Sequence, residues 1–247
     1  MNRKSILDIC YSSTSAQMLD IHLPEAEHFP VFIYFHGGGL EAGDKSSEKV
    51  LFDYLTAKGV AVVTANYRMY PDAQYPDFLV DAASAVAWVF QNIARYGSAE
   101  GIYVGGSSAG GFIAQMLCFD ASWLAVHGIK PLDIAGYVHD AGQPTCHFNV
   151  LRERGIDTRR VIIDESAPLY HIAADKQFPP MLILSSDDDI PGRLEQNKLL
   201  VATMKHFGYT DQVYLKILHG KHCAHTGMVD ENGESVFGKL ILEYIIK

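Results

Sequence analysis

The chain has 247 residues, of which 48% are hydrophobic, and this length and composition suit one soluble globular domain. We therefore expect residues 1–247 to form a single domain. The formal net charge of −9 and the lack of a basic run argue against nucleic acid as a partner. No stretch approaches 18 consecutive apolar residues, so the sequence predicts no membrane span.

The first residues and the cysteines indicate a reducing compartment. Residues 1–8 include basic side chains but no long apolar run, so we expect no secretory signal. Cys10, Cys118, Cys146 and Cys223 are far apart and form no C-x-x-C pair. Reduced thiols in the cytoplasm fit this pattern best.

Apolar runs and helical periodicity alternate along the chain. An early strand ends near residue 24, and further strands are predicted at 31–35, 60–65, 101–105, 134–138, 181–185 and 213–218. Helices are predicted at 77–95, from about 109, at about 192–207 and at 234–246. This alternation predicts an α/β fold in which helices cover both faces of a mostly parallel sheet. In such folds, the loops at the carboxyl ends of the strands carry the catalytic groups.

Residues 140–178 are the least regular part of the sequence. They contain the charged stretch 152–154 and a second basic pair at 159–160. We interpret the segment as a small lid insertion that covers the site. An ordinary long surface connection is the alternative.

Residues 106–110 read Gly-Ser-Ser-Ala-Gly, which is the pattern G-x-S-x-G between a predicted strand and a predicted helix. A sharp turn from strand to helix forces its middle residue into a strained backbone conformation, and the small flanking residues allow strand and helix to approach. The hydroxyl of Ser108 would then stand exposed above the sheet. Ser108 is therefore the candidate nucleophile.

Residues 36–39 read His-Gly-Gly-Gly and directly follow the strand predicted at 31–35. Acyl transfer turns a carbonyl oxygen into an oxyanion, and each fixed N–H donor that binds it is worth roughly 3 kcal/mol. We assign these donors to the backbone N–H groups of Gly38, Gly39 and Ala109. A plain glycine-rich turn is the alternative, but the order of this motif and the nucleophile is that of lipases and esterases.

A serine nucleophile needs a base, and the base needs an orienting acid that lies between serine and base in chain order. Residues 187–189 are three aspartates just after a predicted strand. Three adjacent carboxylates cannot all be buried and charged, so most of them must be solvated. Asp189 is the first choice for the acid and Asp187 the second, with a solvated turn as the alternative reading.

Three histidines follow the last predicted strand. His222 is the first choice for the base, and His225 is the alternative. Together with His219 they also suit a metal site, although no paired ligand motif occurs elsewhere. We interpret Cys223, beside the predicted base, as a packing residue rather than a nucleophile.

These motifs together resemble an α/β-hydrolase of the hormone-sensitive-lipase-like esterase type, and also its smaller acetyl-esterase and kynurenine-formamidase-like members. Residues 36–39 match the oxyanion motif, and 106–110 match the nucleophile turn. The other matches are 66–76 to the Y-R-x-x-P…(F/Y)-P segment, Asp81 and Trp88 to D-x(6)-W, and 220–222 to the closing G-x-(x)-H. The resemblance also selects Asp189, which lies nine residues after Pro180.

The chain departs from this family in two places. Ser107 stands where members commonly have Asp, which removes a negative charge beside the nucleophile. Only about thirty residues of the sequence precede the strand predicted at 31–35, so we expect the large N-terminal cap of this family to be largely missing. We expect a more open site, unless residues 140–178 or the second subunit of a homodimer close it.

The resemblance implies a cytoplasmic serine carboxylesterase that hydrolyses small, short-chain acyl esters without a metal or an organic cofactor. An amidase or formamidase with the same Ser-His-Asp triad is the nearest alternative. A non-catalytic binder on the same fold is a further one, since fold does not determine function. A phosphate-binding loop at 105–111 is disfavoured because no G-K-[S/T] occurs there.

Overall fold

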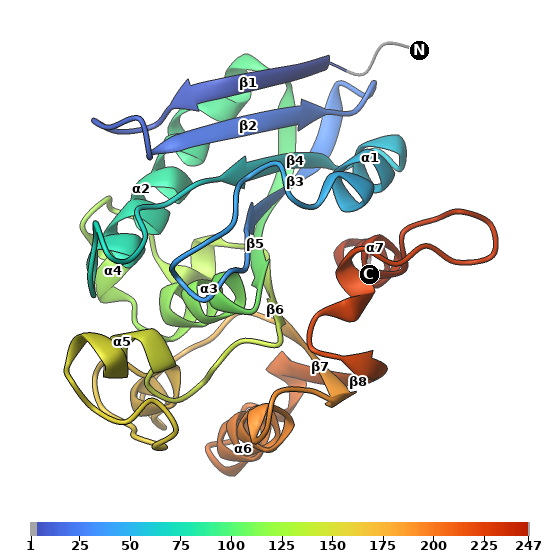
Figure 1. Cartoon of the computed structure of the whole chain (residues 1–247). Coiled ribbons are helices and arrows are strands. Elements are labelled where there is room, and N and C mark those ends of the chain that lie inside the picture. The colour runs from blue at the N-terminus through green and yellow to red at the C-terminus, as the bar shows by residue number, and fades with distance from the viewer. Residues whose placement is uncertain (1–3, 247) are drawn as a thin grey trace.

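Eight strands form one sheet in the computed structural model, which describes residues 4–246 (Figure 1). The strands lie in the order β1-β2-β4-β3-β5-β6-β7-β8. Their bounds are β1 Lys4–Cys10, β2 Met18–Leu23, β3 His28–Phe35, β4 Ala61–Ala65, β5 Ser98–Ser107, β6 Gly136–Asp140, β7 Met181–Asp188 and β8 Val213–Lys221. The pairs β1–β2 and β2–β4 are antiparallel and the later pairs are parallel, so the predicted mostly parallel sheet is confirmed.

Helices cover both faces of this sheet, as predicted. Their bounds are α1 Lys49–Ala57, α2 Asp77–Asn92, α3 Ala109–Phe119, α4 Ser122–Ala125, α5 Phe148–Glu153, α6 Arg193–His206 and α7 Val236–Ile245. Short 3-10 helices occupy Ile93–Arg95, Pro131–Asp133, Pro168–His171, Thr210–Gln212 and Ala224–Thr226. Within residues 4–246, every helix is too short or too polar to span a bilayer.

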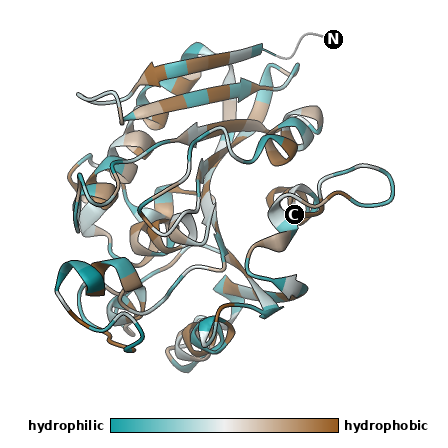
Figure 2. Ribbon diagram, viewed as in Figure 1, coloured by the Kyte–Doolittle hydropathy of each residue, from teal (hydrophilic) through white to brown (hydrophobic). Residues whose placement is uncertain are grey.

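Strand β3 shows how the apolar run at its centre builds two cores. Because successive side chains of a strand point to opposite faces, Val31, Ile33 and Phe35 pack into one cluster with α2, α3 and α6. Phe32 and Tyr34 pack into a second cluster with α1 and α7. Figure 2 shows hydrophobic colour along the central strands. Burial on both faces explains why this strand reads as an unbroken apolar run.

Two elements in the first sixty residues were not predicted. Strand β1 lies at the exposed edge of the sheet, and a bulge between Ile6 and Ile9 interrupts its pairing with β2. The apolar alternation that marks a strand is therefore broken. Helix α1 has only nine residues and follows a polar loop, so its periodicity is short. Residues 1–3, part of the segment in which no secretory signal is expected, lie outside the described residues.

The turn from β5 into α3 is possible only because two glycines let the strand and the helix touch. A Cβ atom at Gly106 would lie 2.5 Å from the backbone of Gly110, and one at Gly110 would lie 1.9 Å from the Phe35 carbonyl oxygen. Between them, Ser108 has φ 55° and ψ −112°, a conformation that residues with a side chain rarely adopt. The packing of β3, β5 and α3 therefore enforces the strain at Ser108.

The substitution Gly110→Ala tests this packing. Helix propensity alone predicts a gain of up to about 1 kcal/mol, because Ala favours helices over Gly. The overlap with the fixed Phe35 backbone predicts the opposite sign, a loss of about 3 kcal/mol in the free energy of unfolding. Urea denaturation followed by circular dichroism measures the difference.

Gly227→Ala is the matched control, since a Cβ there meets no atom within 4 Å and φ is −95°. It should change stability by less than about 0.5 kcal/mol. A Gly110→Ala protein as stable as the parent would contradict the described turn.

Candidate active site

Three side chains from distant parts of the sequence meet at the carboxyl ends of the strands. The Nε2 atom of His222 lies 2.8 Å from Ser108 Oγ, and its Nδ1 atom lies 2.5 Å from Asp189 Oδ1. Ser108 follows β5, Asp189 follows β7 and His222 follows β8, so parallel strands deliver all three to one edge. The structure thus brings the first choices for nucleophile, acid and base into one hydrogen-bonded chain. Their catalytic roles stay predictions.

Asp189 is held as a carboxylate at the inner end of this chain. Its side chain is 1% exposed, and that burial raises its pKa. The hydrogen bond and the charge of His222 outweigh burial, and the Ile190 N–H donates a further hydrogen bond of 2.7 Å, so the pKa lies below its usual value. An ionised Asp189 keeps the proton of His222 on Nδ1 and leaves Nε2 free to accept from Ser108.

The second choices for acid and base have other partners. Asp187 accepts from exposed His219 at 2.9 Å, and from the Gly220 N–H. The Nε2 atom of His225 lies 2.8 Å from Asp140 Oδ1 instead. The three histidines therefore turn toward three different aspartates. Within residues 4–246, no three His, Cys, Asp or Glu side chains are grouped as metal ligands.

The pair of His225 and Asp140 is a feature that the sequence analysis did not identify. Asp140 is the last residue of β6, its carbonyl oxygen accepts from the Ser108 N–H at 2.8 Å, and both side chains of the pair are at most 5% exposed. Burial lowers the pKa of His225, but the hydrogen bond and charge of Asp140 outweigh this and raise it. The signal in the sequence was an aspartate at the end of the strand beside the nucleophile strand.

The His-Gly-Gly-Gly segment folds into a tight loop against the nucleophile. Gly38 has φ 116° and Gly39 has φ 67°, and a Cβ at Gly38 would lie 1.9 Å from the Ala42 carbonyl oxygen. The Gly38 carbonyl accepts from the N–H groups of Glu41 and Ala42. Glycine is therefore required at position 38 by conformation and by space.

His36 fixes the start of this loop and is not placed for proton transfer. Its ring stacks on Tyr67 with centroids 4.5 Å apart, and the Tyr67 hydroxyl donates to the His36 carbonyl at 2.9 Å. Its Nδ1 atom lies 2.7 Å from the Gly37 carbonyl oxygen. Burial lowers the pKa of His36, so the ring is neutral and serves as a packing element.

The three predicted oxyanion donors are the N–H groups of Gly38, Gly39 and Ala109. Within the described part of the chain, none of them donates a hydrogen bond to another residue. Ala109 is the first residue of α3, where the N–H groups of the first turn lack a partner inside the helix. The loop also lies directly against the nucleophile, since a Cβ at Gly37 would be 3.3 Å from Ser108 Cβ.

Ser107, which replaces the expected aspartate, takes part in a neutral contact. Its Oγ atom accepts from the Tyr34 hydroxyl at 3.0 Å, and both residues are buried. Burial raises the pKa of Tyr34 well above its usual value, so the phenol keeps its proton. The residue before Ser108 therefore brings a neutral hydroxyl pair and no charge to the site, as its sequence implies.

Helix α5 lies within the predicted lid insertion 140–178. It packs against residues 36–42, the oxyanion loop. Asn149 donates to the Gly39 carbonyl at 3.0 Å, and Arg152 forms an ion pair with Glu41 of the loop. Phe148 contributes its side chain to the wall of the site. The segment therefore supports the loop from one side, and its action as a lid stays a prediction.

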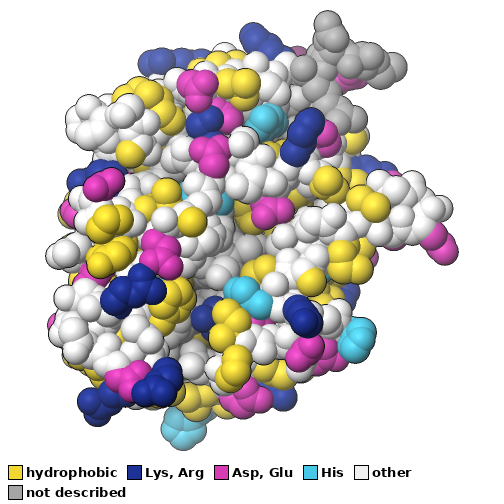
Figure 3. All heavy atoms as spheres, viewed as in Figure 1, with side chains coloured by type: hydrophobic (Ala, Val, Ile, Leu, Met, Phe, Trp, Pro, Cys, Tyr) yellow, Lys and Arg dark blue, Asp and Glu magenta, His cyan; other side chains and the backbone are white. Residues whose placement is uncertain are grey.

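Ser108, His222 and the oxyanion loop line a cavity of about 530 Å³. On the face shown in Figure 3, histidine and acidic side chains lie beside a hollow. The lining residues are Gly37, Gly38, Gly39, Glu41, Gly43, Ser47, Glu48, Ser107, Ser108, Phe148, Ile190, His222, Cys223 and Thr226. Burial raises the pKa of the Cys223 thiol well above its usual value, which makes this thiol a poor nucleophile.

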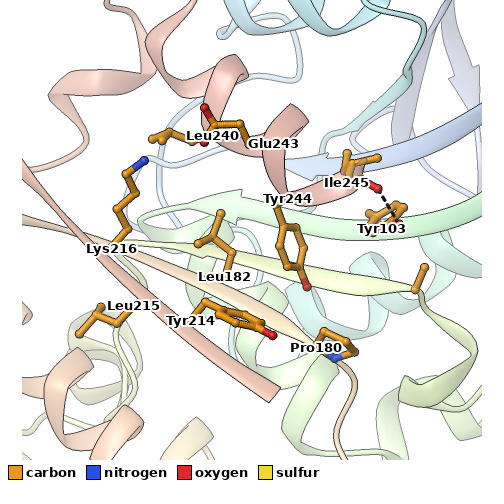
Figure 4. A pocket seen from close by; sticks show the side chains of 11 residues that line it. Tyr103, Pro180, Leu182, Tyr214, Leu215, Lys216, Leu240, Glu243, Tyr244 and Ile245 are labelled. Atoms are coloured by element: carbon orange, nitrogen blue, oxygen red, sulfur yellow. Dashed lines mark hydrogen bonds between the residues drawn. The ribbon is translucent and has the colours of Figure 1, made fainter. Parts of the chain in front are cut away.

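A second cavity, of about 510 Å³, lies at the amino ends of β7 and β8 against α7 (Figure 4). Its walls are mainly apolar and aromatic, and the Tyr103 hydroxyl donates to the Ile245 carbonyl at 3.2 Å. Figure 4 shows Tyr244 pointing between Tyr214 and Pro180. The lining contains no serine, histidine or cysteine, so the cavity at Ser108 is the candidate active site.

Comparison with known proteins gives several esterases, a kynurenine formamidase and a gibberellin receptor among the relatives. Residues 19–128 match the family model BD-FAE. The chain is 24% identical over 84% of its length to the probable isoprenylcysteine alpha-carbonyl methylesterase ICMEL1 of Arabidopsis thaliana, and 29% identical over 46% to kynurenine formamidase of Danio rerio. It covers 48% and 39% of these two proteins, so the chain spans at most about half of their length.

The fold is that of solved esterase structures. Esterase B from Lactobacillus rhamnosis superimposes with a TM-score of 0.80 over 98% of this chain and 84% of that protein, at 17% sequence identity. At 17% sequence identity, this superposition shows that the two proteins share a fold.

A pH series on His225→Gln tests the buried pair with Asp140. The pKa of His225 is raised in the folded state, so its protonation stabilises the fold below about pH 6.5, and this contribution is lost as the pH rises through the folded pKa. Glutamine keeps a donor for Asp140 but has no charge to lose. The substitution should therefore cost about 1 kcal/mol more at about pH 6 than at about pH 9, measured by urea denaturation.

His219→Gln is the control, because the pair of His219 with Asp187 is exposed and should give a smaller difference. If His225→Gln costs the same stability at both pH values, or more at the higher pH, then protonation of His225 beside Asp140 does not stabilise the fold.

Proposed function

We propose that this chain, which has the α/β-hydrolase fold, is a serine carboxylesterase that cleaves short-chain acyl esters through Ser108, His222 and Asp189. The observation that carries the proposal is the hydrogen-bonded chain from Asp189 through His222 to Ser108 beside free backbone N–H groups. The methylesterase among its sequence relatives supports an ester substrate.

In the first step, the Nε2 atom of His222 takes the hydroxyl proton of Ser108 while Oγ bonds to the ester carbonyl carbon. The carbonyl π electrons move to oxygen, and the N–H groups of Gly38, Gly39 and Ala109 bind the resulting oxyanion. Each such donor contributes roughly 3 kcal/mol when it is fixed in advance. The strained conformation of Ser108 presents Oγ at the start of α3, next to these donors.

In the second step, the carbonyl re-forms, the bond to the alcohol oxygen breaks and His222 gives its proton to the leaving alcohol. Water then attacks the acyl-enzyme, with His222 as the base, and releases the acid and Ser108. Asp189 keeps the ring oriented and stabilises its charged form throughout. The lowered pKa of Asp189 keeps it ionised for this task.

The dimensions of the site favour small substrates. A cavity of about 530 Å³ is at the lower to middle part of the range for small-molecule sites. Apart from Phe148 and Ile190, its lining offers few large apolar side chains for a long acyl chain. We therefore propose acetyl to butyryl groups as the acyl part.

Cleavage of an amide by the same residues is the second candidate, and the likeness to a kynurenine formamidase favours it. The chemistry differs mainly in the leaving group, which is an amine that His222 must protonate before it can depart.

Ser108→Ala should lower kcat/KM for p-nitrophenyl acetate at least about a thousandfold, because the nucleophile is removed. It should also abolish labelling by a fluorophosphonate probe, which tests the non-catalytic alternative at the same time. Ser107→Ala is the matched control. It removes the acceptor of the Tyr34 hydroxyl, so it should lower the free energy of unfolding by about 1–2 kcal/mol and retain most of the activity. Equal activity of parent and Ser108→Ala would contradict the proposal.

A matched substrate series tests the reaction type and the acyl size. The parent protein should hydrolyse p-nitrophenyl acetate and butyrate faster than the octanoate, and faster than p-nitroacetanilide, because the cavity is small and an alcoholate leaves more easily than an amine. The kcat/KM values for the four substrates show which bond is cleaved faster and which acyl size is preferred. A larger value for the anilide would assign the site to amides.

A further inference from the structure

We propose that Glu48 makes this site select esters whose alcohol part carries a positive charge. The inference rests on the proposed esterase function and names a substrate class for it. Glu48 immediately precedes α1 and lines the same cavity as Ser108 and His222. None of the sequence motifs assigns this residue a role.

The position of Glu48 relative to the reaction follows from the base. His222 must protonate the departing alcohol oxygen, so the alcohol part of an ester has to lie beside His222 Nε2. Cys223 and Thr226, which follow the base, line the cavity together with Glu48. The Thr226 hydroxyl donates to the Cys223 carbonyl at 3.0 Å, and the Thr226 side chain acts on the Glu48 carboxyl, so it lies close to that carboxyl. Glu48 therefore lies at the alcohol end of the cavity.

The charges around Glu48 leave it without a cationic partner. The other carboxylate of the lining, Glu41, forms an ion pair with Arg152, whereas no ion pair within residues 4–246 involves Glu48. His225 favours the charged form of the Glu48 carboxyl, but the His225 ring already pairs with Asp140 at 2.8 Å. One negative charge thus remains uncompensated at this end of the site.

The Glu48 carboxyl is also partly buried, which disfavours its charged form. Burial raises the pKa of the Glu48 carboxyl, and the Asp140 charge adds to this, while Thr226 and His225 act in the opposite direction. A carboxylate that is half-buried and short of positive charge gains when a cation binds beside it. A partly desolvated site also screens the attraction less than open water does.

The test compares two esters of the same shape. Acetylcholine carries a quaternary ammonium group, and 3,3-dimethylbutyl acetate has a neutral carbon in its place. The change in the ratio of their kcat/KM values between parent and variant isolates the effect of charge at position 48, because the acyl group is shared and the inductive effect of the ammonium group on the leaving alcohol is the same in every variant. We expect the parent protein to prefer the cationic ester, and Glu48→Gln to lower the ratio about five- to tenfold.

Two variants show whether charge at position 48 is the cause. Glu48→Asp keeps the carboxylate and should restore most of the ratio. Glu41→Gln removes a lining carboxylate that is already paired with Arg152, so it should alter the ratio by less than about twofold. An unchanged ratio in Glu48→Gln, or an equal loss with both esters in every variant, would overturn the inference.

Binding without turnover separates this inference from the esterase proposal. In Ser108→Ala, NMR titration of the ligand methyl signals should show tighter binding of acetylcholine than of the neutral ester, and adding Glu48→Gln should remove the difference. A parent protein that hydrolyses no ester, with this binding preference intact, contradicts the esterase proposal alone. Equal binding of the two esters to Ser108→Ala contradicts the role of Glu48 alone.

Discussion

The contact between β5 and α3 determines where every other part of the site must be. With Gly106 and Gly110 in backbone contact, the chain has no room for a wider turn, and Ser108 takes a positive φ that lifts Oγ out of the sheet. The same contact directs the amino end of α3 and its free N–H groups toward Oγ. The oxyanion loop can then approach because Gly37 has no side chain to meet Ser108.

Next to the turn from β5 into α3, the site contains two pairs of an aspartate with a histidine, and only one of these pairs reaches the cavity. His222 with Asp189 reaches Ser108, whereas His225 with Asp140 is buried and ends under the nucleophile. The carbonyl of Asp140 also accepts from the Ser108 N–H, so the second pair is joined to the strained residue through the backbone. Burial keeps this second pair away from the cavity, so in the proposed mechanism the first pair transfers the proton.

Short contiguous motifs account for what could be predicted from the sequence. Gly-x-Ser-x-Gly and His-Gly-Gly-Gly each describe one turn, and their local sterics are visible in the letters. The choice between Asp187 and Asp189 could not be made from local pattern, since it depends on which carboxylate the strand end turns inward. The pairing of Asp140 with His225 spans 85 residues and requires the register of β6 against β5. The bulged strand β1 was missed for the same reason, because its pairing with β2 and not its own pattern defines it.

A site with few large apolar side chains in its wall must discriminate by polar groups. Helix α5 supports one side of the oxyanion loop, and Phe148 and Ile190 are the large apolar side chains among the described residues that line the cavity. Ser107 with Tyr34 contributes a neutral contact beside Ser108, so the negative charge at the site comes from elsewhere. Glu48 supplies it from the start of α1, on the side where the base meets the leaving group. Moving a carboxylate from beside the nucleophile to the alcohol end would remove its repulsion of the oxyanion and keep its attraction for a cationic substrate.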